Sequence, residues 1–504
     1  MKTTSIAPLF ETDAYKLNHG AGGIHGHGMY PAKTEYVYSN FTNRSTRVEG
    51  VTKIVHFGLQ AFIQNYIMDA FEPFFAADED EVARLYEERV FQILGPNNTG
   101  SEHIRKLHRK GYLPLEFRAV TEGTLVPLQV PSFTIENTDP EFFWVTNYVE
   151  TVTSSSYWFP STSATTALLA RKLLEDWAEK TGTPIEAVDY QFHDFSFRGM
   201  SSPSSASTSG AGHLTSFKGS DNLNAIEWID YLYPGDNGTI LNSVAASEHS
   251  VMVADGRDNE VETYRRLLEE FPTGILSLVS DTWDLFGSVV DKVLPELHEQ
   301  IMARDGKLVI RPDSGDPANI LCGTVREFEK GTTDEEKGLI ELLWDQFGGT
   351  VNDKGFKVLD EHIGAIYGDS IYYGRADDIL ERLAHKGFAS GNIVFGVGSY
   401  TYNMTTRDTM GGSAIKATWI QVDGVGRDVM KDPKTGSGKK SATGRLAVLK
   451  DREGELYLVE KATQAQEDFS ELRTIWKDGE WVRKQSFADV RATLRESAKN
   501  LKRI

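Results

Sequence analysis

The segment 307–317 (KLVIRPDSGDP) places several chemically capable side chains directly after a short apolar run. Arg311 offers a planar set of hydrogen-bond donors that suits a phosphate, whereas Asp313 and Asp316 suit ribose hydroxyls or magnesium. A single motif of this kind is equally consistent with a capped turn that carries surface ion pairs. Its repetition along the chain favours a ligand site.

Six further apolar runs end in polar or glycine-rich residues of the same kind. They are VDYQFHDFSFRG (188–199), HLTSFKGSDN (213–222), LNSVAASEHS (241–250), GILSLVSDTWD (274–284), IGAIYGDSI (363–371) and NIVFGVGSYTYN (392–403). In the last run, the glycine turn would let backbone N–H groups point at an anion. Gly368 and Asp369 end the run before it and Arg407 follows it, which favours phosphate binding over an ordinary turn.

Two histidine positions in these runs have both a chemical and a structural interpretation. His249 could be a general base, a transient acceptor of phosphate or a core histidine. The adjacent His193 and Asp194 could suggest a metal-dependent phosphohydrolase, but no second pair stands at the spacing of metal ligands. We therefore do not favour a metal site on this pair.

Phe195, Phe197 and Arg198 combine aromatic faces with a cation at the end of one run. Phenylalanine at alternating positions usually packs in a core, but a flat heteroaromatic substrate needs such a stacking face. Asp221 could then accept a hydrogen bond from the polar edge of that substrate.

The elements that position these residues alternate between strands and helices. Helical patterns at 259–271 and 376–386 separate several of the apolar runs. Polar residues at the ends of successive strands are typical of a parallel β/α barrel whose loops at one rim carry the site. We expect this α/β barrel over residues 161–409, with a doubly wound open sheet as the second choice of fold.

The remaining chain predicts a second, β-rich α+β domain made of residues 1–160 and 410–504. Strand patterns occupy 33–40 and 115–137, and a helical pattern occupies 78–94; a further helical pattern at 161–180 opens the barrel region. After a basic, glycine-rich stretch that begins at Lys431, the runs RLAVLK and LYLVEK predict two short strands that could rejoin the N-terminal sheet.

Composition narrows the classes of function. The formal net charge of -20 argues against nucleic acid or an anionic membrane as the main partner. The single cysteine, Cys322, excludes an internal disulfide and suits a reducing cytoplasm. We expect no leader peptide and no membrane span. We also expect the Gly/His-rich run 20–28 to be a surface loop and not a metal site.

Eight motifs in one order make the sequence recognisable. They are TDAYK (12–16), HDFSFRG (193–199), FKGSD (217–221), EHS (248–250), SDTWD (280–284), IRPDSGDP (310–317), YGD (367–369) and FGVGS with TRD (395–399 and 406–408). On these motifs, and on the KDP, KKS and GRL stretch at 431–446, the chain resembles the nicotinamide phosphoribosyltransferases, a family of type II phosphoribosyltransferases.

This resemblance implies an irregular β/α barrel beside the β-rich domain, in a homodimer that shares its active sites. The implied reaction joins nicotinamide to phosphoribosyl pyrophosphate and yields nicotinamide mononucleotide and pyrophosphate for NAD salvage. The resemblance also implies a need for Mg²⁺ and a coupled hydrolysis of ATP through a phosphohistidine.

The resemblance further implies roles for individual residues. Phe195 and Tyr15 of the partner subunit should stack on the two faces of the pyridine ring, with Asp221 accepting from the carboxamide and Arg198 nearby. The ribose phosphate should be held by Arg311, Asp313, Gly368, Asp369, Gly398, Ser399 and Arg407. Asp281 should orient and activate His249, which carries phosphate. Pyrophosphate or ATP should meet Lys431, Lys439 and Arg44 of the partner subunit.

Two departures from the family pattern affect these expectations. Ser399 and Tyr400 follow Gly398 where the family has further glycines, and Ser196 with Phe197 replaces a glycine-tyrosine pair. Three other functions stay open: a nicotinate or quinolinate phosphoribosyltransferase, a barrel-fold phosphohydrolase, and a ligand-binding protein without catalysis. Asp221 argues against the nicotinate or quinolinate enzyme, because a carboxylate accepts a hydrogen bond from an amide but repels the like charge of nicotinate.

Overall fold

The protein is described here from a computed structural model, which covers residues 4–20, 28–235, 238–325, 331–431 and 441–503. The chain divides into two compact units. The sheet unit contains Met1–Thr165, Ile229–Asp236 and Thr405–Asn500, and the barrel unit contains Thr166–Trp228, Asn237–Met404 and Leu501–Ile504. The long helix α6 (Glu150–Thr181) contributes residues to both units.

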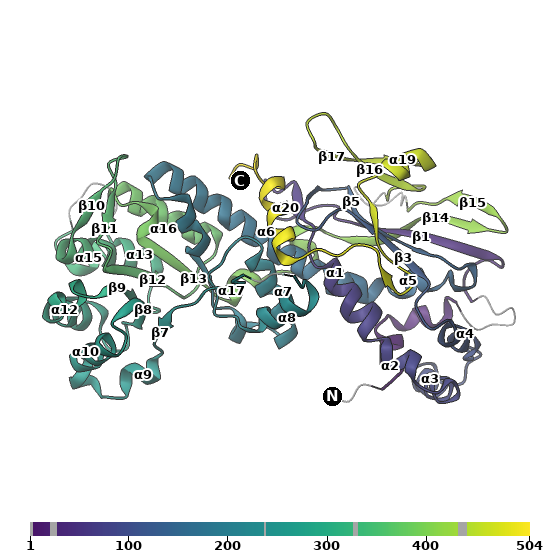
Figure 1. Ribbon diagram of the computed structural model, residues 1–504, viewed down its shortest axis with the longest axis horizontal. Helices are drawn as coiled ribbons and strands as arrows, with labels where there is room; N and C mark the ends of the chain where they lie inside the picture. The colour runs from purple at the N-terminus through teal and green to yellow at the C-terminus, as the bar shows by residue number, and fades with distance from the viewer. Residues whose placement is uncertain (1–3, 21–27, 236–237, 326–330, 432–440, 504) are drawn as a thin grey trace. The chain divides into compact units, whose positions relative to one another are not determined.

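The sheet unit is built on a seven-stranded antiparallel sheet (Figure 1). Its strands, in spatial order, are β15 (Val425–Asp428), β14 (Ala414–Val422), β1 (Thr34–Thr42), β5 (Pro131–Asn137), β3 (Leu115–Ala119), β18 (Arg473–Lys477) and β19 (Glu480–Trp481). The strands predicted at 33–40 and within 115–137 are therefore present. β1 pairs with β14 from Thr34 opposite Val422 to Thr42 opposite Ala414, with two register shifts between them, so the first and last parts of the chain share one sheet.

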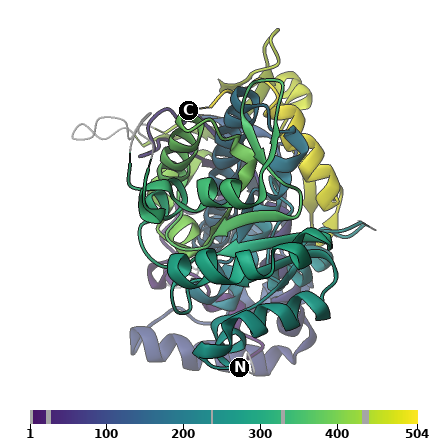
Figure 2. The ribbon, with the colours of Figure 1, turned by 90° about the vertical axis from the view of Figure 1, so that its left-hand side faces the viewer.

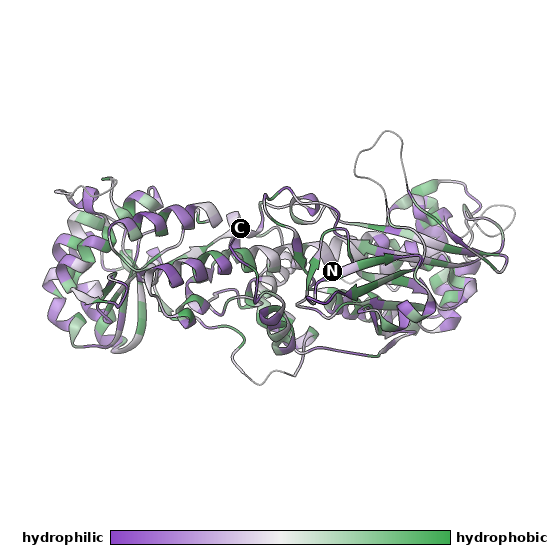
Figure 3. Ribbon diagram, turned by 90° about the horizontal axis from the view of Figure 1, so that it is seen from above, coloured by the Kyte–Doolittle hydropathy of each residue, from purple (hydrophilic) through white to green (hydrophobic). Residues whose placement is uncertain are grey.

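Helices cover this sheet and bury its apolar face. The helix predicted at 78–94 is α3 (Glu79–Leu94), and Asp78 caps it by accepting from the backbone N–H groups of Asp80 and Glu81. Two further helices of the unit are α4 (Glu102–Lys110) and α20 (Phe487–Ser497). Phe41, Phe117, Phe133 and Trp476 belong to the buried core, and Figure 3 shows hydrophobic stretches along the strands.

The strands predicted from RLAVLK and LYLVEK form, but they do not rejoin the large sheet. β16 (Leu446–Lys450) and β17 (Leu456–Glu460) pair only with each other. Their apolar residues Val448 and Leu456 instead pack against Val120 and Val126 in a small separate core. The C-terminal contribution to the large sheet comes from β14, β15, β18 and β19.

The barrel unit contains six parallel strands in the order β6, β13, β12, β9, β8, β7. Their bounds are β6 (Phe192–Asp194), β7 (Ala245–Ala246), β8 (Thr273–Val279), β9 (Asp305–Arg311), β12 (Ile363–Tyr367) and β13 (Ile393–Val397). The last strand lies beside the first and the others follow in sequence, which is the order of a barrel. The doubly wound alternative is wrong, because that fold requires the order to reverse inside the sheet.

Single bridges, and not full strands, continue the pairing between β6 and β7. Asp194 bridges Ser220, and Gly219 bridges Asn242, both in parallel orientation. The strand expected in HLTSFKGSDN is therefore absent, because helix α7 (Pro203–Leu214) extends into the first residues of that run. These bridges leave the barrel irregular on this side.

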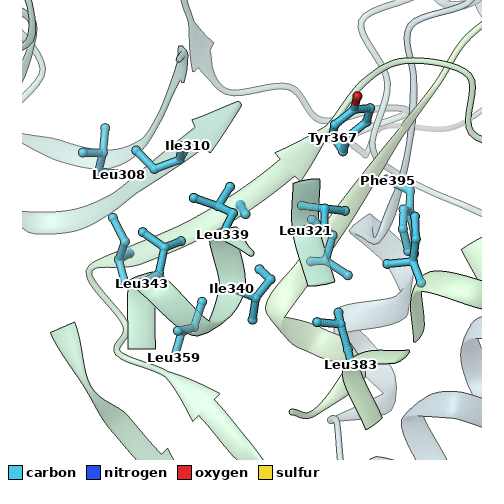
Figure 4. Packing of buried hydrophobic residues seen from close by; sticks show 14 of the residues in the cluster. Leu308, Ile310, Leu321, Leu339, Ile340, Leu343, Leu359, Tyr367, Leu383 and Phe395 are labelled. Atoms are coloured by element: carbon cyan, nitrogen blue, oxygen red, sulfur yellow. The ribbon is translucent and has the colours of Figure 1, made fainter. Parts of the chain in front are cut away.

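Helices surround the barrel strands on the outside, as Figure 2 shows with this unit facing the viewer. They include α10 (Glu260–Glu270), α13 (Pro317–Cys322), α15 (Leu339–Phe347) and α16 (Tyr373–His385). Leu308 and Ile310 of β9 are fully buried in the cluster that these helices help to form (Figure 4). Burial of each such side chain contributes about 1.5–3 kcal/mol. The alternate residues of β9 consequently face the barrel interior.

The expectations about membrane spans and about the Gly/His-rich loop can be compared with the structure only over the described residues. Within the described residues, no helix combines the length and the apolar character that crossing a membrane requires. His25 and His27 of the predicted Gly/His-rich loop, and Lys439, lie outside the described residues.

Candidate active site

A cavity of about 730 Å³ opens at the carboxyl ends of the barrel strands. It is lined by Phe195, Ser196, Phe197, Arg198, Gly199, Asp221, Asn222, Arg311, Asp313, Gly368, Asp369, Gly398 and Ser399. Most of these residues end or follow β6, β9, β12 and β13, and Asp221 with Asn222 follows the bridge residue Ser220, so the parallel sheet brings segments distant in sequence to one rim. We call this cavity the rim pocket.

The Phe195 ring is fixed on the wall of the rim pocket. The backbone N–H of Phe195 donates to Val397 O at 2.8 Å, which anchors the residue to β13. The Arg311 guanidinium carbon lies 4.9 Å from the ring centroid. A Cβ atom on Gly396 would stand 2.6 Å from the ring, so only glycine leaves room for this position. The ring is thereby held where a flat ligand could stack on it.

Asp221 is oriented by two neighbours that bind the same carboxylate oxygen. His193 Nε2 lies 3.0 Å from Asp221 Oδ1, and Ser243 Oγ donates to Oδ1 at 2.5 Å. Because a carboxylate only accepts, Nε2 must carry the imidazole proton. Burial alone would raise the pKa of the Asp221 carboxyl, but the hydrogen bonds from His193 and Ser243 hold that pKa below its usual value. Oδ2 is left without a hydrogen-bond partner among the described residues.

Arg311 and Asp313 form a second group of polar residues on the wall of the rim pocket. Arg311 Nη2 donates to Asp313 Oδ2 at 3.0 Å. The backbone N–H of Asp313 donates to Asp281 Oδ2 at 3.0 Å, which fixes the turn after β9. A Cβ atom on Gly368 would lie 2.8 Å from Asp313 Oδ1, so this glycine allows β12 and the Asp313 carboxylate to approach closely. The pair presents donors and acceptors suited to a sugar phosphate.

The loop after β12 carries a strained residue that the sequence did not indicate. Ser370 has φ of 55°, in the left-handed region, and its hydroxyl donates to Asp369 Oδ2 at 2.9 Å. Arg375 Nη1 donates to Ser370 O at 2.8 Å and holds this conformation. The left-handed conformation costs a residue other than glycine on the order of 1 kcal/mol of folding free energy, and residues strained in this way are common in ligand-binding loops. Ser370 thus supports the orientation of Asp369.

The profile of the Nicotinate phosphoribosyltransferase (NAPRTase) family matches residues 190–480 of the chain. The chain belongs to this family. A relative from Acinetobacter baylyi named nicotinamide phosphoribosyltransferase is 46% identical over 99% of both chains. A relative of the same name from Xanthomonas campestris pv. campestris is 34% identical over 96% of this chain and 97% of its own.

Two solved structures share the fold of this chain. The nicotinate-nucleotide pyrophosphorylase of Pyrococcus furiosus has a TM-score of 0.56 at 14% identity, covering 98% of this chain and 96% of its own. The human nicotinic acid phosphoribosyltransferase has a TM-score of 0.54 at 16% identity, covering 97% and 94%. The expected phosphoribosyltransferase architecture, a parallel β/α barrel with a separate antiparallel sheet, is therefore confirmed.

The structure brings most of the predicted site residues of this NAPRTase-family chain to the rim pocket. Those that line it are Phe195, Arg198, Asp221, Arg311, Asp313, Gly368, Asp369, Gly398 and Ser399. His249 and Asp281 are not among the lining residues. His249 Nδ1 lies 3.3 Å from Thr282 Oγ1, whereas Asp281 binds the Asp313 N–H. No hydrogen bond joins His249 to Asp281 among the described residues: Asp281 Oδ2 accepts from the Asp313 N–H, and Asp281 Oδ1 has no partner.

The other predicted residues belong to the sheet unit. Tyr15 is 62% exposed, and Arg407 begins the short helix α18 (Arg407–Met410). Arg44 Nε donates to Gly412 O at 2.8 Å. Sequence reasoning missed Lys416 on β14, whose pKa is lowered by burial and by positive charges that include those of Arg44 and Lys431. Lys416 therefore lies within electrostatic reach of both cations.

The described residues contain no group of three or more His, Cys, Asp or Glu side chains arranged for a metal ion. The adjacent side chains of His193 and Asp194 have different partners: His193 Nε2 donates to Asp221, and Asp194 Oδ1 accepts from the Ser196 N–H at 2.8 Å. Mg²⁺ commonly uses one or two carboxylates together with the phosphates of its substrate. Asp313 and Asp369 on the rim pocket fit such a role. Asp281, whose Oδ2 accepts from the Asp313 N–H, has a buried Oδ1 without a partner.

Proposed function

We propose that this protein transfers the 5-phosphoribosyl group of phosphoribosyl pyrophosphate to nicotinamide. The products are nicotinamide mononucleotide and pyrophosphate, as in NAD salvage. Two relatives that share nearly the full length of the chain carry the name nicotinamide phosphoribosyltransferase. The rim pocket supplies a stacking face, a fixed carboxylate and a phosphate-binding side within one cavity.

The observation that carries the choice of nicotinamide is the state of Asp221. The pKa of this carboxyl is held below its usual value, so the group is ionised at neutral pH and can only accept. The amide NH₂ of nicotinamide donates to such a group, whereas the carboxylate of nicotinate meets a like charge. The pocket therefore favours the amide over the acid.

The proposed chemistry needs no general base. The pyridine nitrogen has a free lone pair, so its bond to C1 of the ribose forms as the bond from C1 to the pyrophosphate oxygen breaks, and no proton moves. The contribution of the protein is to hold both reactants in line and to stabilise the departing anion. Phe195 and Asp221 would hold the pyridine, and Arg311 with Asp313 would hold the sugar phosphate.

The cations of the sheet unit are the proposed ligands of the pyrophosphate. Burial and the charges of Arg44 and Lys431 lower the pKa of Lys416, whereas Glu150, 3.7 Å from Lys416 Nζ, opposes that shift. We infer a homodimer in which Tyr15 of the partner subunit covers the pyridine, which suits the exposure of Tyr15 in the single chain. Mg²⁺, held by Asp313 or Asp369, would neutralise part of the pyrophosphate charge. A cytoplasmic location stays a prediction.

Coupling to ATP through His249 is a separate proposal. His249 is exposed at the first position of the short helix α9 (His249–Val253), and its Nδ1 lies 3.3 Å from Thr282 Oγ1, so the imidazole is accessible to a phosphate donor. In this step the imidazole nitrogen would form the bond to the γ-phosphorus of ATP while ADP leaves.

Product analysis tests the proposed function. The purified protein is incubated with phosphoribosyl pyrophosphate, Mg²⁺ and ATP, and either nicotinamide or nicotinic acid is supplied in separate reactions. We expect nicotinamide mononucleotide in the first reaction and little nicotinate mononucleotide in the second. Product from nicotinic acid alone would assign the sister activity. Release of phosphate from sugar phosphates, with no pyridine product, would favour the phosphohydrolase instead.

A further inference from the structure

His213 is a fully buried histidine near the end of α7, and it is not among the residues that line the rim pocket. Its ring stacks on Phe217, with the ring centroids 5.1 Å apart and an angle of 21° between the planes. Packing of this kind would serve a phenylalanine equally well. The two ring nitrogens, however, both have hydrogen-bond partners, and these partners belong to two different segments of the rim.

The first partner is the segment that leads to Asp221. His213 Nε2 lies 2.9 Å from Gly219 O, which also accepts from the Asp194 N–H at 3.2 Å. Because a carbonyl only accepts, Nε2 carries the imidazole proton. The Asp221 N–H in turn donates to Asp194 O at 2.9 Å. His213 therefore fixes the backbone two residues before the carboxylate that is the proposed acceptor of the pyridine amide.

The second partner is the short helix that follows the glycine turn of β13. His213 Nδ1 lies 2.6 Å from the Tyr402 hydroxyl. With the imidazole proton on Nε2, Nδ1 accepts and the hydroxyl donates. Burial raises the pKa of Tyr402 well above its usual value, so the hydroxyl keeps its proton. Tyr402 ends α17 (Ser399–Tyr402), which begins directly after Gly398, so this bond holds the turn that lines the rim pocket.

The pairing of the strands alone does not hold these two segments in place. β13 pairs with β6 only as far as Val397 opposite Asp194, and both Asp221 and Gly398 lie beyond that point. One rigid imidazole, with a donor on one side and an acceptor on the other, spans the interval between them. Transfer between two bound reactants depends steeply on their separation, and a misplacement of about 1 Å can cost on the order of a hundredfold in rate.

We propose that His213 is a positioning residue, which sets the spacing between the Asp221 carboxylate and the Gly398–Ser399 turn through its two opposed hydrogen bonds. The inference rests on the proposed function, because it takes the pyridine and the ribose phosphate as the ligands of these two segments. His213 itself contacts neither ligand.

Two substitutions of His213 separate its two bonds. The amide nitrogen of His213→Gln reaches the place of Nε2 and keeps the donor to Gly219 O, whereas the amide oxygen of His213→Asn takes the place of Nδ1 and keeps the acceptor for Tyr402. We expect His213→Gln to raise the KM for phosphoribosyl pyrophosphate roughly threefold to tenfold, with a smaller change for nicotinamide. His213→Asn should do the reverse.

Steady-state kinetics with each substrate varied in turn measure this split, and melting temperatures show which variants fold. Equal changes in both KM values in the folded variants, or no change in either, would overturn the proposal. No nicotinamide mononucleotide from the unmodified protein would contradict the proposed function and the inference together. Product from the unmodified protein without the split would contradict the inference alone.

Tyr402→Phe is the milder variant, because it removes only the hydroxyl. It should reproduce the KM change of His213→Gln, and the two substitutions combined should cause no further increase, since both remove the same bond. Thr181→Val is the matched control: Thr181 is buried outside the rim pocket, and its hydroxyl donates to Trp177 O at 2.8 Å. Its KM values should stay unchanged. An unchanged KM in Tyr402→Phe, or independent effects in the double variant, would overturn the proposal.

Discussion

His193 donates a hydrogen bond through Nε2 to Oδ1 of Asp221, at 3.0 Å. Ser243 binds the same oxygen, so Oδ2 is the acceptor that remains for a ligand. In the proposed reaction, His193 would thus be a positioning residue that acts on the pyridine through Asp221.

Replacing His193 by Leu should raise the KM for nicotinamide about tenfold with a smaller change in kcat, because one charge-assisted hydrogen bond to Asp221 is lost. His193→Gln keeps a donor of similar reach and should restore most of the affinity. Steady-state kinetics with nicotinamide measure both. A Gln variant as impaired as the Leu variant would show that His193 matters only for packing against Phe195.

Asp221→Asn should weaken the discrimination between nicotinamide and nicotinic acid. The neutral amide no longer repels a carboxylate and offers a donor to it, a change of about 1–3 kcal/mol, or roughly tenfold to a hundredfold in the ratio of kcat/KM values. The ratio is measured with each pyridine at saturating phosphoribosyl pyrophosphate. Asp258→Asn, in an exposed turn of the same unit, is the matched control. An unchanged ratio in Asp221→Asn would remove Asp221 from the assigned role.

Gly396→Ala should displace the Phe195 ring, since the new Cβ would lie 2.6 Å from it. Overpacking of this kind costs about 1–3 kcal/mol, so we expect a lower melting temperature and a KM for nicotinamide raised about tenfold. Gly238→Ala, where no atom lies within 4 Å of the added Cβ, is the control and should change neither quantity. Normal kinetics in Gly396→Ala would mean that stacking on Phe195 does not hold the substrate.

The rim of the barrel is predictable from the sequence because each apolar run ends in its own polar residues. In a parallel sheet these ends must meet at one edge, so the sequence alone groups Arg311, Asp313 and Asp369. Nothing comparable in the sequence indicates that the strand expected in HLTSFKGSDN does not form. The helical residues of α7 continue to Leu214, and the remainder pairs only through isolated bridges.

Contacts between side chains distant in sequence are beyond the reach of sequence patterns. His193 suggests a metal ligand because its neighbour is Asp194, but the barrel turns it toward Asp221, 28 positions along the chain. The family resemblance implies a contact between His249 and Asp281, whereas in the structure His249 Nδ1 lies 3.3 Å from Thr282 Oγ1. Lys416 belongs to no motif, and its role depends on the pairing of β14 with β1.

Lys416→Arg should extend anion binding to higher pH. Burial, together with the charges of Arg44 and Lys431, lowers the pKa of Lys416, so this lysine loses its proton, and its attraction for pyrophosphate, at a lower pH than an ordinary lysine does. Arginine stays protonated throughout. Calorimetric affinity for pyrophosphate should therefore fall by roughly threefold to tenfold as the pH rises toward the ordinary lysine pKa of about 10.4 in the unmodified protein, and less in the variant. Lys461→Arg, an exposed position paired with Asp428, is the control. Parallel pH profiles of the unmodified protein and Lys416→Arg would place Lys416 outside the pyrophosphate site.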